Sequence, residues 1–447
     1  MQLHEAAHAL NAVAVGADVA FDIVASDSRA LPEGCLFVAL KGPRFDGHAY
    51  AAQALAEGAA AVMVEASAGL DLAPAIVVED SRIGLGRLAA WHRSRMPARV
   101  AAITGSNGKT TVKEMLAAIC AAAVGEGAVL ATAGNLNNDI GMPLTLLRLN
   151  PAHRYAAIEM GMNHSGEIAY MTELARPDVA LVNNALRAHL EGLGSVEAVA
   201  RAKGEIYAGL KEDGIAIVNA DDTHADYWRG LAGGRKVMSF GVAAGADVRI
   251  VAGGEPLVLE TPAGRIETML GVPGEHNRRN AAAAATAALA LGIAPEAVAR
   301  GLAAYTGSKG RLQAHPCILG ATLIDDSYNA NPASVLAAIQ VLAARTGTRI
   351  LVLGDMGELG PEAARLHREV GERARAAGID RLLCLGDLSV NAVAGFGDGA
   401  MHFERIEELL AEIECALGAG VTILVKGSRF MKMERVTQSF VEKQQCA

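Results

Sequence analysis

The chain has 447 residues, more than one ordinary domain, and at roughly 150 residues per domain about three domains are expected. Hydrophobic residues make up 51% and charged residues 20% of the chain, which supplies several apolar cores and excludes an intrinsically disordered protein. Its 40 Lys and Arg against 49 Asp and Glu give a net charge of −9 without a basic block, which argues against a protein that wraps nucleic acid.

The cysteines and the N-terminal segment indicate a cytoplasmic chain. The six cysteines are scattered without CxxC spacing, as in a reduced protein rather than a disulfide scaffold or a zinc module. The first basic residue is Arg29, so the basic segment of a secretory signal is missing. The longest apolar run, 281–293, contains Thr286 and is too short to span a bilayer. We therefore expect a cytoplasmic α/β protein without an integral membrane segment.

The first segment, residues 1–98, is expected to be a small α/β domain. Its apolar runs predict strands at 36–40, 60–64 and 75–78, and helices at 49–57 and 84–95. Pro97 ends the last of these helices because proline cannot continue a helix, and this places the first boundary.

The second segment, residues 99–308, alternates apolar strands with helices. Strands are predicted at 100–103, 155–158, 179–182 and 215–218, and helices at 111–122, 196–210 and 280–291. Strands that are apolar throughout are typical of a parallel sheet covered on both faces.

The third segment, residues 309–447, shows the clearest strand–helix alternation. Strands are predicted at 322–324, 350–353, 382–385 and 422–425, each followed by a polar or glycine-containing turn and a helical stretch. This alternation predicts a doubly wound, Rossmann-like domain.

A phosphate-binding loop is the strongest motif in the sequence. Residues 104–111 read Thr-Gly-Ser-Asn-Gly-Lys-Thr-Thr and lie between a predicted strand and a predicted helix. Glycines let backbone N–H groups face phosphate oxygens, and the helix N-terminus adds free donors. Lys109 could reach the β- and γ-phosphates, and the Thr110 hydroxyl could bind Mg²⁺. Ile103 stands where the strict Walker A pattern has its first glycine, so the loop is shorter than in that pattern. A phosphate-binding loop is nevertheless favoured over a simple glycine-rich turn, because the Gly-Lys-Thr sequence lies between a strand and a helix.

Three further residues are candidates for the same chemistry. Glu159 ends a predicted strand, where a carboxylate beside a phosphate loop suits Mg²⁺. His189 and Lys203 do not stand out by themselves, because they resemble an ordinary loop histidine and an ordinary surface lysine.

The order of motifs gives these residues a context. This order of motifs resembles that of the Mur ligase family, the ATP-dependent amide-forming enzymes of peptidoglycan precursor synthesis. The resemblance extends from about residue 26 to about residue 429. The matching features are 104–111, 132–138 with Gly141 and Pro143, Glu159, His189, Lys203, 219–222, 274–277 with Asn280, 310–311 and 325–332.

Within the family, the chain looks most like the member that adds D-alanyl-D-alanine to UDP-N-acetylmuramoyl-tripeptide. The motifs that carry this likeness lie at 27–29, 34–40 and 46–48, and at 328–332, 353–360 and 426–429. The Asp-Asn-Pro-Arg motif of the diamino-acid-adding member is absent. The resemblance implies a role for each predicted domain. The first domain, residues 1–98, would bind the UDP-sugar substrate, and the second, residues 99–308, would bind ATP. The third, residues 309–447, would be a Rossmann-like domain that binds the dipeptide.

The resemblance also implies roles for single residues. The catalytic residues would be Lys109, Glu159, His189 and Lys203, and two Mg²⁺ ions would be held by Thr110, Glu159, His189 and a carbamylated Lys203. ATP would be bound by Gly105, Ser106, Asn107, Gly108, Lys109, Thr110, Thr111, Asn135, Asn277, Asn280, Arg311 and Asp326. The substrates would be bound by Ser28, Arg29, Tyr328, Asn329, Asn331, Ser428 and Arg429. Carbamylation is chemically reasonable, because CO₂ turns a repelling ammonium into an anionic oxygen ligand.

The expected reaction is amide formation through an acyl phosphate, in a monomeric cytoplasmic enzyme that serves cell-wall synthesis and thereby cell shape and division. Two alternatives remain open at this point. A sister ligase would add a single amino acid, although the Asp27-Ser28-Arg29 segment argues against folate as its substrate. A nucleotide-dependent switch would need an Asn-Lys-x-Asp guanine motif, which the chain lacks. The third residue of the tripeptide, diaminopimelate or lysine, is also open.

Overall fold

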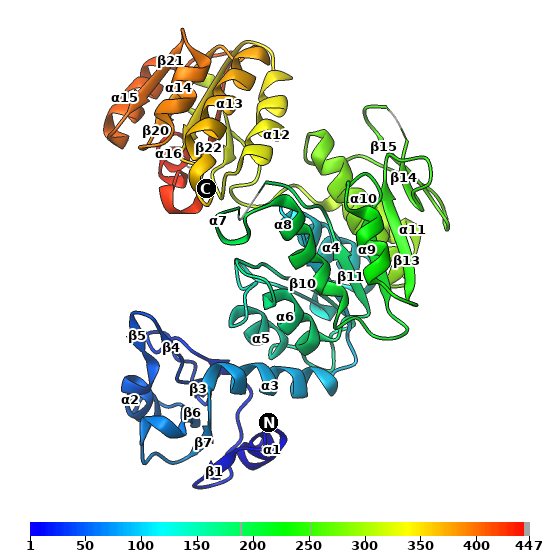
Figure 1. The fold of residues 1–447 in the computed structure, drawn as a ribbon, viewed down its shortest axis with the longest axis vertical. Coiled ribbons are helices and arrows are strands. Elements are labelled where there is room, and N and C mark those ends of the chain that lie inside the picture. The colour runs from blue at the N-terminus through cyan, green and yellow to red at the C-terminus, as the bar shows by residue number, and fades with distance from the viewer. Residues whose placement is uncertain (188–189, 252, 442–447) are drawn as a thin grey trace, which may run out of the picture.

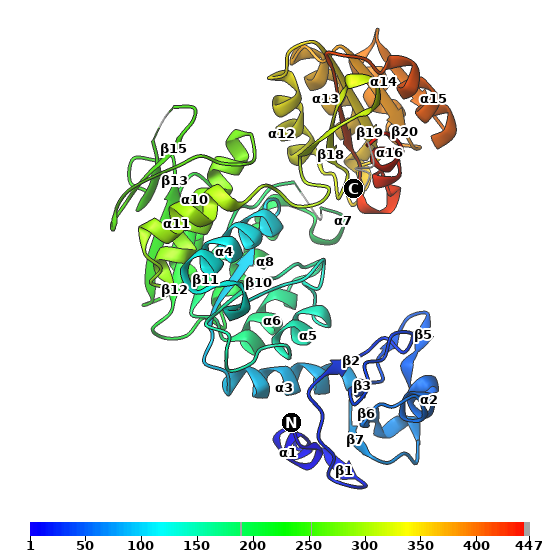
Figure 2. The same ribbon diagram turned by 180° about the vertical axis from the view of Figure 1, so that it is seen from behind.

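Three domains follow one another along an elongated molecule (Figure 1). The computed structural model describes residues 1–187, 190–251 and 253–441. In these residues, sheets of five, nine and six strands form the centres of the three domains. The first domain lies at one end, the third at the other, and the second between them; the view from behind shows the same order (Figure 2).

The first sheet has the order β1-β7-β6-β3-β2 and is parallel except for β1. Its strands are β1 (Val13–Val15), β2 (Val24–Ala25), β3 (Leu36–Val38), β6 (Ala61–Glu65) and β7 (Ala75–Val78). Helices α1 (Leu3–Ala9) and α2 (Ala51–Ala56) and the hairpin β4 (Lys41–Gly42) and β5 (Phe45–Asp46) complete the domain. The predicted strands are confirmed, because continuous apolar runs fit strands that are buried on both faces.

Helix α3 (Ser81–Ser94) joins the first domain to the second. It begins at Ser81 because the Asp80 carboxylate accepts hydrogen bonds from the backbone N–H groups of Arg82 and Ile83, a normal helix N-cap. Buried residues of α3, among them Leu85 and Leu88, belong to one apolar cluster that contains side chains from both domains. The two domains therefore share a continuous core along this helix (Figure 1).

The second sheet has the order β16-β15-β14-β13-β12-β11-β8-β10-β9. It is parallel from β9 to β14, and β15 and β16 extend it in antiparallel fashion. Its strands are β8 (Arg99–Thr104), β9 (Val129–Ala131), β10 (Tyr155–Glu159), β11 (Val179–Val182), β12 (Ile215–Asn219), β13 (Lys236–Gly241), β14 (Val248–Ile250), β15 (Leu257–Thr261) and β16 (Gly264–Thr268).

Helices cover both faces of this sheet, and alternate residues of β8 point into two different cores. Ala101 and Ile103 pack with α4 (Lys109–Val124), α10 (Glu275–Ala290) and α11 (Pro295–Ala304). Val100 and Ala102 pack on the opposite face. That face is covered by α5 (Gly141–Leu146), α6 (Glu167–Ala175), α8 (Val196–Gly204) and α9 (Ala225–Leu231). The short α7 (Leu190–Leu193) precedes α8.

The third sheet has the order β17-β18-β22-β19-β20-β21 and is parallel except for the edge strand β17. Its strands are β17 (Gln313–Pro316), β18 (Thr322–Asp326), β19 (Thr348–Gly354), β20 (Arg381–Leu385), β21 (Ala400–Phe403) and β22 (Val421–Lys426). Its helices are α12 (Pro332–Ala343), α13 (Ala363–Ala376), α14 (Val390–Phe396), α15 (Ile406–Ala416) and α16 (Glu434–Phe440). The predicted doubly wound α/β domain is confirmed.

The differences from the sequence-based elements are local. The helix predicted over 196–210 ends at Gly204 and continues as a 3₁₀ turn over Glu205–Tyr207. Strands β15 and β16 at the edge of the second sheet were not predicted, because β15 ends in Glu260 and Thr261 and most of β16 is exposed, with Ile266 as its one large apolar residue. In the part of the chain that the structure describes, no helix combines the length and apolar character needed to cross a membrane.

Candidate active site

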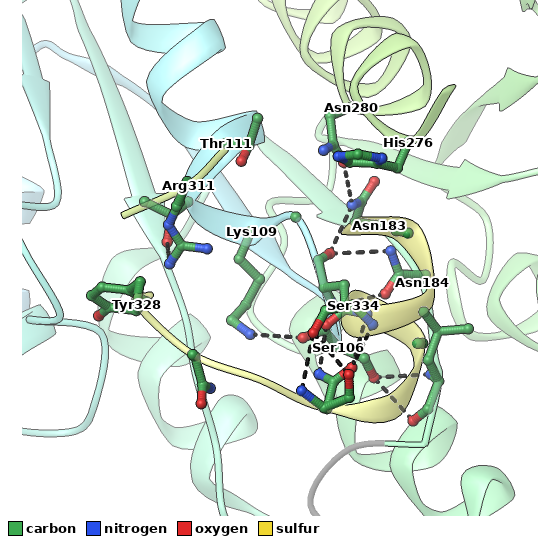
Figure 3. Close-up of a pocket in the computed structure, with 18 of the residues that line it drawn as sticks. Ser106, Lys109, Thr111, Asn183, Asn184, His276, Asn280, Arg311, Tyr328 and Ser334 are labelled. Atoms are coloured by element: carbon green, nitrogen blue, oxygen red, sulfur yellow. Dashed lines mark hydrogen bonds between the residues drawn. The ribbon is translucent and has the colours of Figure 1, made fainter. Parts of the chain in front are cut away.

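A cleft of about 1070 Å³ lies between the second and third domains. The second domain supplies residues that follow the carboxyl ends of parallel strands β8, β10, β11 and β12, where an open α/β sheet normally binds its ligand. The third domain supplies the segment after β18 and the turn after β22. Figure 3 shows Arg311 and Tyr328 on one side of this cleft and Asn183, Asn280 and His276 on the other, with Lys109 between them.

The phosphate loop follows β8 and leads directly into α4. Gly108 has φ +79°, and a Cβ at this position would come within 2.3 Å of Asn280 Oδ1 and 2.6 Å of Asn183 Nδ2. Glycine is therefore required here by both the backbone conformation and the space. The free N–H groups at the start of α4 face the cleft, an arrangement suited to a bound phosphate.

Lys109 is held over the loop by the loop's own backbone. Its Nζ donates hydrogen bonds to the carbonyl oxygens of Gly105 at 2.8 Å and Ser106 at 3.4 Å. Loss of solvent lowers the pKa of Lys109, and the nearby Glu159 carboxylate opposes this effect. A half-buried lysine at the floor of the cleft interacts more strongly with an anionic ligand than a fully solvated one does.

Oxygen and amide groups converge on Glu159, which is 2% exposed. Its Oε2 accepts a hydrogen bond from the Thr110 hydroxyl at 2.7 Å, and its Oε1 accepts one from Asn137 Nδ2 at 2.6 Å. The backbone N–H of Glu159 donates to Thr132 Oγ1 at 2.9 Å, which fixes the end of β10. A carboxylate and a hydroxyl beside a phosphate loop are hard oxygen donors, so the residues present fit Mg²⁺.

Lys203, at the end of α8, has an unusual environment for a lysine. Its side chain is fully buried, and within the described residues its Nζ has no hydrogen-bond partner. Burial, reinforced by the positive charge of Lys109, lowers the pKa of Lys203 well below its ordinary value. A neutral buried amine is the form that reacts with CO₂, so this environment fits a carbamate. Within the described residues no group of three or more His, Cys, Asp and Glu side chains could hold a metal.

An amide network surrounds the phosphate loop. Asn184 Oδ1 accepts from the backbone N–H of Asn107 at 2.9 Å, and Asn183 Nδ2 donates to the Asn107 carbonyl at 2.9 Å. Asn183 Nδ2 also donates to Asn280 Oδ1 at 3.0 Å, and Asn280 in turn donates to Asn277 Oδ1 at 3.3 Å. The start of α10 is thereby connected to the backbone of the phosphate loop through side chains from two segments outside that loop.

The third domain reaches into the same cleft through charged and amide groups. Arg311 donates to the Thr110 hydroxyl at 2.9 Å. Asn331 Nδ2 donates to Asn107 Oδ1 at 2.7 Å, and Asn107 Nδ2 donates back to Asn331 Oδ1 at 3.3 Å. The buried Asp326 carboxylate accepts from Lys426 Nζ at 2.5 Å. Burial raises the pKa of Asp326, and the Lys426 charge works against this rise.

Comparisons with known proteins identify the family. Three family models match consecutive parts of the chain: Mur ligase family, catalytic domain, at 20–103; Mur ligase middle domain at 103–288; and Mur ligase, glutamate ligase domain, at 310–429. The chain is 48% identical over 98% of its length to the UDP-N-acetylmuramoyl-tripeptide–D-alanyl-D-alanine ligase of Escherichia coli, of which 97% is covered. The chain belongs to the Mur ligase family.

Other relatives and solved structures agree with this assignment. The Haemophilus influenzae protein of the same name is 43% identical to this Mur ligase. The matched region covers 96% of this chain and 95% of the Haemophilus influenzae protein. The crystal structure of MurF from Acinetobacter baumannii superposes with a TM-score of 0.89 at 35% identity, covering 98% of each chain. The MurF ligase from Thermotoga maritima in complex with ADP gives a TM-score of 0.82 at 27% identity, covering 93% of this chain and 96% of that one.

Most site residues predicted from the sequence of this Mur ligase line the cleft. They are Ser106, Asn107, Gly108, Lys109, Thr110, Thr111, Asn135, Glu159, Asn277, Asn280, Arg311, Asp326, Tyr328, Asn329, Asn331, Ser428 and Arg429. Gly105 contributes the carbonyl that holds Lys109, and Lys203 lies buried behind the cleft surface. His189 lies outside the described residues.

Two predicted substrate residues lie elsewhere in this Mur ligase. Ser28 and Arg29 belong to the first domain and do not line the cleft. The Arg29 side chain is 87% exposed and pairs with Asp27 at 2.7 Å. The predicted role for these two residues therefore requires a substrate that extends from the cleft to the first domain.

Sequence reasoning missed several residues that the fold of this Mur ligase places in the cleft. Asn183 and Asn184 follow β11, and their position at a strand end was the signal that could have singled them out. His276 also lines the cleft, and burial together with Lys426 and Arg279 lowers its pKa to about 4, so its imidazole is neutral at pH 7. Glu358 lies on the third-domain side.

Proposed function

We propose that this protein is an ATP-dependent ligase that joins D-alanyl-D-alanine to UDP-N-acetylmuramoyl-tripeptide, which gives the pentapeptide precursor of peptidoglycan. The observation that carries the proposal is the cleft in which the phosphate loop and Glu159 of the second domain face Arg311 and the Tyr328–Asn331 segment of the third. The relatives that are 48% and 43% identical over nearly the whole chain bear the name of this activity.

The order of bond changes follows from carboxylate chemistry. A carboxylate is a poor acyl donor because its leaving group would be oxide. An oxygen of the tripeptide's terminal carboxylate attacks the γ-phosphorus of ATP, the bond to the bridging oxygen breaks, and ADP leaves. The amine of D-alanyl-D-alanine then attacks the carbonyl carbon of the acyl phosphate. The C–O bond breaks, inorganic phosphate leaves, and the amine loses its proton as the amide forms.

The second domain holds and neutralises the transferred phosphoryl group. Lys109 and the N–H groups at the start of α4 supply positive charge from the floor of the cleft, and Arg311 supplies it from the facing domain. Such fixed charges lower the barrier by stabilising the developing negative charge. Asn135, Asn277 and Asn280 contact the nucleotide, and Asp326 reaches its ribose. Among the loop residues, Gly105, Ser106, Asn107, Gly108 and Thr111 surround the phosphates.

Two magnesium ions complete the proposed site. Thr110 and Glu159 would hold one, and His189 and a carbamylated Lys203 would hold the other. Bound Mg²⁺ would offset phosphate charge during transfer. Two observations support these assignments: the hydrogen bond between Thr110 and Glu159, and the buried amine of Lys203, which has no hydrogen-bond partner in the described ranges of the chain.

The substrate-binding roles are divided among the domains. Residues 1–98 bind the UDP-sugar, with Ser28 and Arg29 contributing, and 309–447 bind the dipeptide. The substrate-binding residues of the third domain are Tyr328, Asn329, Asn331, Ser428 and Arg429. Residues 99–308 bind ATP, and closure of the third domain on the second brings the three substrates together. The enzyme acts as a cytoplasmic monomer in cell-wall synthesis, and through it in cell shape and division.

The experiment that tests this function is an assay of ATP-dependent phosphate release with UDP-N-acetylmuramoyl-tripeptide, with and without D-alanyl-D-alanine. Single amino acids serve as alternative acceptors, and mass spectrometry identifies the product. Phosphate release that requires the dipeptide, together with a new UDP-linked pentapeptide, is the expected result.

Two other results would contradict the proposal in different ways. Turnover only with a single amino acid would assign the chain to a sister ligase with the same chemistry. Tight ATP binding without turnover with any acceptor would favour a nucleotide-dependent binding protein. Lysine- and diaminopimelate-containing tripeptides, compared by kcat/KM, identify the preferred third residue.

A further inference from the structure

Arg311 and Tyr328 form a cation–π pair at the edge of the cleft. The central carbon of the Arg311 guanidinium lies 4.3 Å from the centroid of the Tyr328 ring. Figure 3 shows the two side chains next to each other, with the guanidinium directed toward the start of α4. This distance is well within the range at which an aromatic face attracts a cation.

Local backbone contacts fix the ring relative to the arginine. The backbone N–H of Tyr328 donates to the Gly310 carbonyl at 3.1 Å, so the residue before Arg311 is bound to the tyrosine backbone. Gly310 has φ +71°, and a Cβ there would lie 3.2 Å from the Tyr328 Cβ and backbone nitrogen. Glycine at 310 thus allows the chain to pass close to Tyr328, which places the next side chain, Arg311, over the ring.

The ring holds the guanidinium without neutralising its charge. Within the described part of the chain no carboxylate lies at ion-pair distance from the Arg311 guanidinium, although the Asp326 carboxylate interacts with its charge at longer range. The one side-chain hydrogen bond of Arg311 among these residues goes to Thr110 Oγ1. A carboxylate partner would occupy the N–H donors and offset the positive charge. An aromatic face binds the flat surface of the guanidinium and leaves its in-plane N–H groups available. This arrangement suits an arginine that must bind phosphate.

We propose that Tyr328 is a positioning residue for Arg311, whose ring directs the guanidinium toward the phosphates of ATP. The proposal rests on the proposed function, and it gives Tyr328 a nucleotide-side role in addition to the predicted substrate contact. Arg429 lies farther from the same ring, at 5.7 Å, and pairs with Glu434 at 2.8 Å, so Arg311 is the main partner of Tyr328.

The test measures the affinity of the full-length protein for N-methylanthraniloyl-ATP in the presence of Mg²⁺ by fluorescence, with unlabelled ATP as competitor. The variants are Tyr328→Leu, Tyr328→Phe, Arg311→Met and the double variant Arg311→Met with Tyr328→Leu. Tyr328→Leu is expected to weaken binding by about two- to thirtyfold, the range of a single cation–π contact. Tyr328→Phe keeps the aromatic face and is expected to restore most of the lost affinity.

The double variant separates positioning from a general structural effect. If Tyr328 acts through Arg311, removing the ring in the Arg311→Met background is expected to change the nucleotide affinity by less than about twofold. Equal losses in both backgrounds, or a Tyr328→Phe variant as weak as Tyr328→Leu, would overturn the proposal. Unchanged affinity in Tyr328→Leu would overturn it as well.

A matched control uses another partly exposed tyrosine. Tyr227 on α9 is 42% exposed and does not line the cleft, so Tyr227→Leu is expected to bind the nucleotide as the unsubstituted protein does. Thermal denaturation of each variant excludes unfolding, and half-buried Tyr328 tolerates leucine better than a core position would. Because binding is measured without turnover, failure of the ligase assay and failure of this proposal give different results.

Discussion

The hydroxyl of Thr110 accepts a 2.9 Å hydrogen bond from Arg311, a residue 201 positions later in the chain. The same hydroxyl donates its proton to Glu159 Oε2 at 2.7 Å. One side chain of the phosphate loop therefore joins the acidic end of β10 to the basic residue of the third domain. Both contacts depend on an oxygen atom at this position.

Replacing Thr110 by valine is expected to reduce kcat for phosphate release by at least about a hundredfold, similar to the loss of one well-placed polar group in other active sites. Valine keeps the shape of threonine and removes only the hydroxyl, so the fold is expected to survive. Thr110→Ser, which keeps the oxygen, is expected to lose no more than about tenfold. Steady-state kinetics with thermal denaturation as the folding control measure the difference. Equal kcat values for the serine and valine variants would rule out a role for this hydroxyl.

The buried amine of Lys203 predicts an enzyme that needs a carboxylate at this position. Lys203→Ala is expected to lose nearly all activity, because it removes the group that becomes the carbamate. Short-chain carboxylic acids such as acetate or propionate are expected to restore part of the activity by filling the space with an anionic oxygen. Mass spectrometry of the intact protein would detect the added carboxyl group directly. Full activity of Lys203→Ala would remove this lysine from the mechanism.

Asn331 combines two separable roles. Its Oδ1 accepts from the Ser334 N–H at 2.9 Å as the N-cap of α12, and its Nδ2 donates to Asn107 across the cleft. Asn331→Asp keeps the capping oxygen and removes the donor, whereas Asn331→Ala removes both. Loss of the cap costs about 1 kcal/mol, or roughly 4 °C in the melting of a domain of this size.

Differential scanning calorimetry is expected to show this shift in the third-domain transition for Asn331→Ala and a much smaller one for Asn331→Asp. Asn331→Ala is expected to raise the KM for ATP more than Asn331→Asp, because the alanine variant loses both hydrogen bonds with Asn107, whereas the aspartate variant loses only the one that Nδ2 donates. An unchanged KM for ATP in both variants would show that the contact between Asn331 and Asn107 does not affect ATP binding.

His367 predicts a pH dependence of the third domain. The imidazole is fully buried, its Nε2 accepts from the Met356 N–H at 2.9 Å, and its Nδ1 donates to the Ala363 carbonyl at 2.7 Å, so the neutral form is required. Burial lowers the pKa of His367, although the nearby Asp355 carboxylate opposes this. The pKa of His367 is lower in the folded protein than in the unfolded protein, where it is about 6.5. The neutral imidazole therefore stabilises the fold fully above a pH of about 6.5, and this stabilisation is lost as the pH falls through the folded-state pKa.

The variant His367→Gln tests this linkage, because glutamine offers an acceptor to Met356 but does not titrate. The melting temperature of the unsubstituted protein is expected to fall more steeply between pH 7 and pH 4 than that of the variant. The two curves are compared as a difference, since His92, His153 and His276 also have lowered pKa values and contribute equally to both proteins. Parallel curves would contradict the prediction.

Local patterns in the sequence determined much of this protein. The apolar runs that became β8, β10, β11 and β12 predicted their strands because such runs are stable only when buried on both faces. The glycines and Lys109 of the phosphate loop were also recognisable, because a tight turn before a helix leaves few choices of residue. The order of the motifs indicated the family and its reaction.

The tertiary structure alone decided how these pieces combine. Lys203 resembles a surface lysine in the sequence, and only packing within the second domain removes it from water and leaves its amine without a hydrogen-bond partner among the residues that the structure describes. Arg311 reaches Thr110 only because the third domain faces the second across the cleft. Burial and contacts between distant segments depend on the positions of whole sheets and helices, whereas spacing along the chain specifies only local structure. The sequence therefore predicted most of the polar groups that line the cleft, while the fold determined which of them meet.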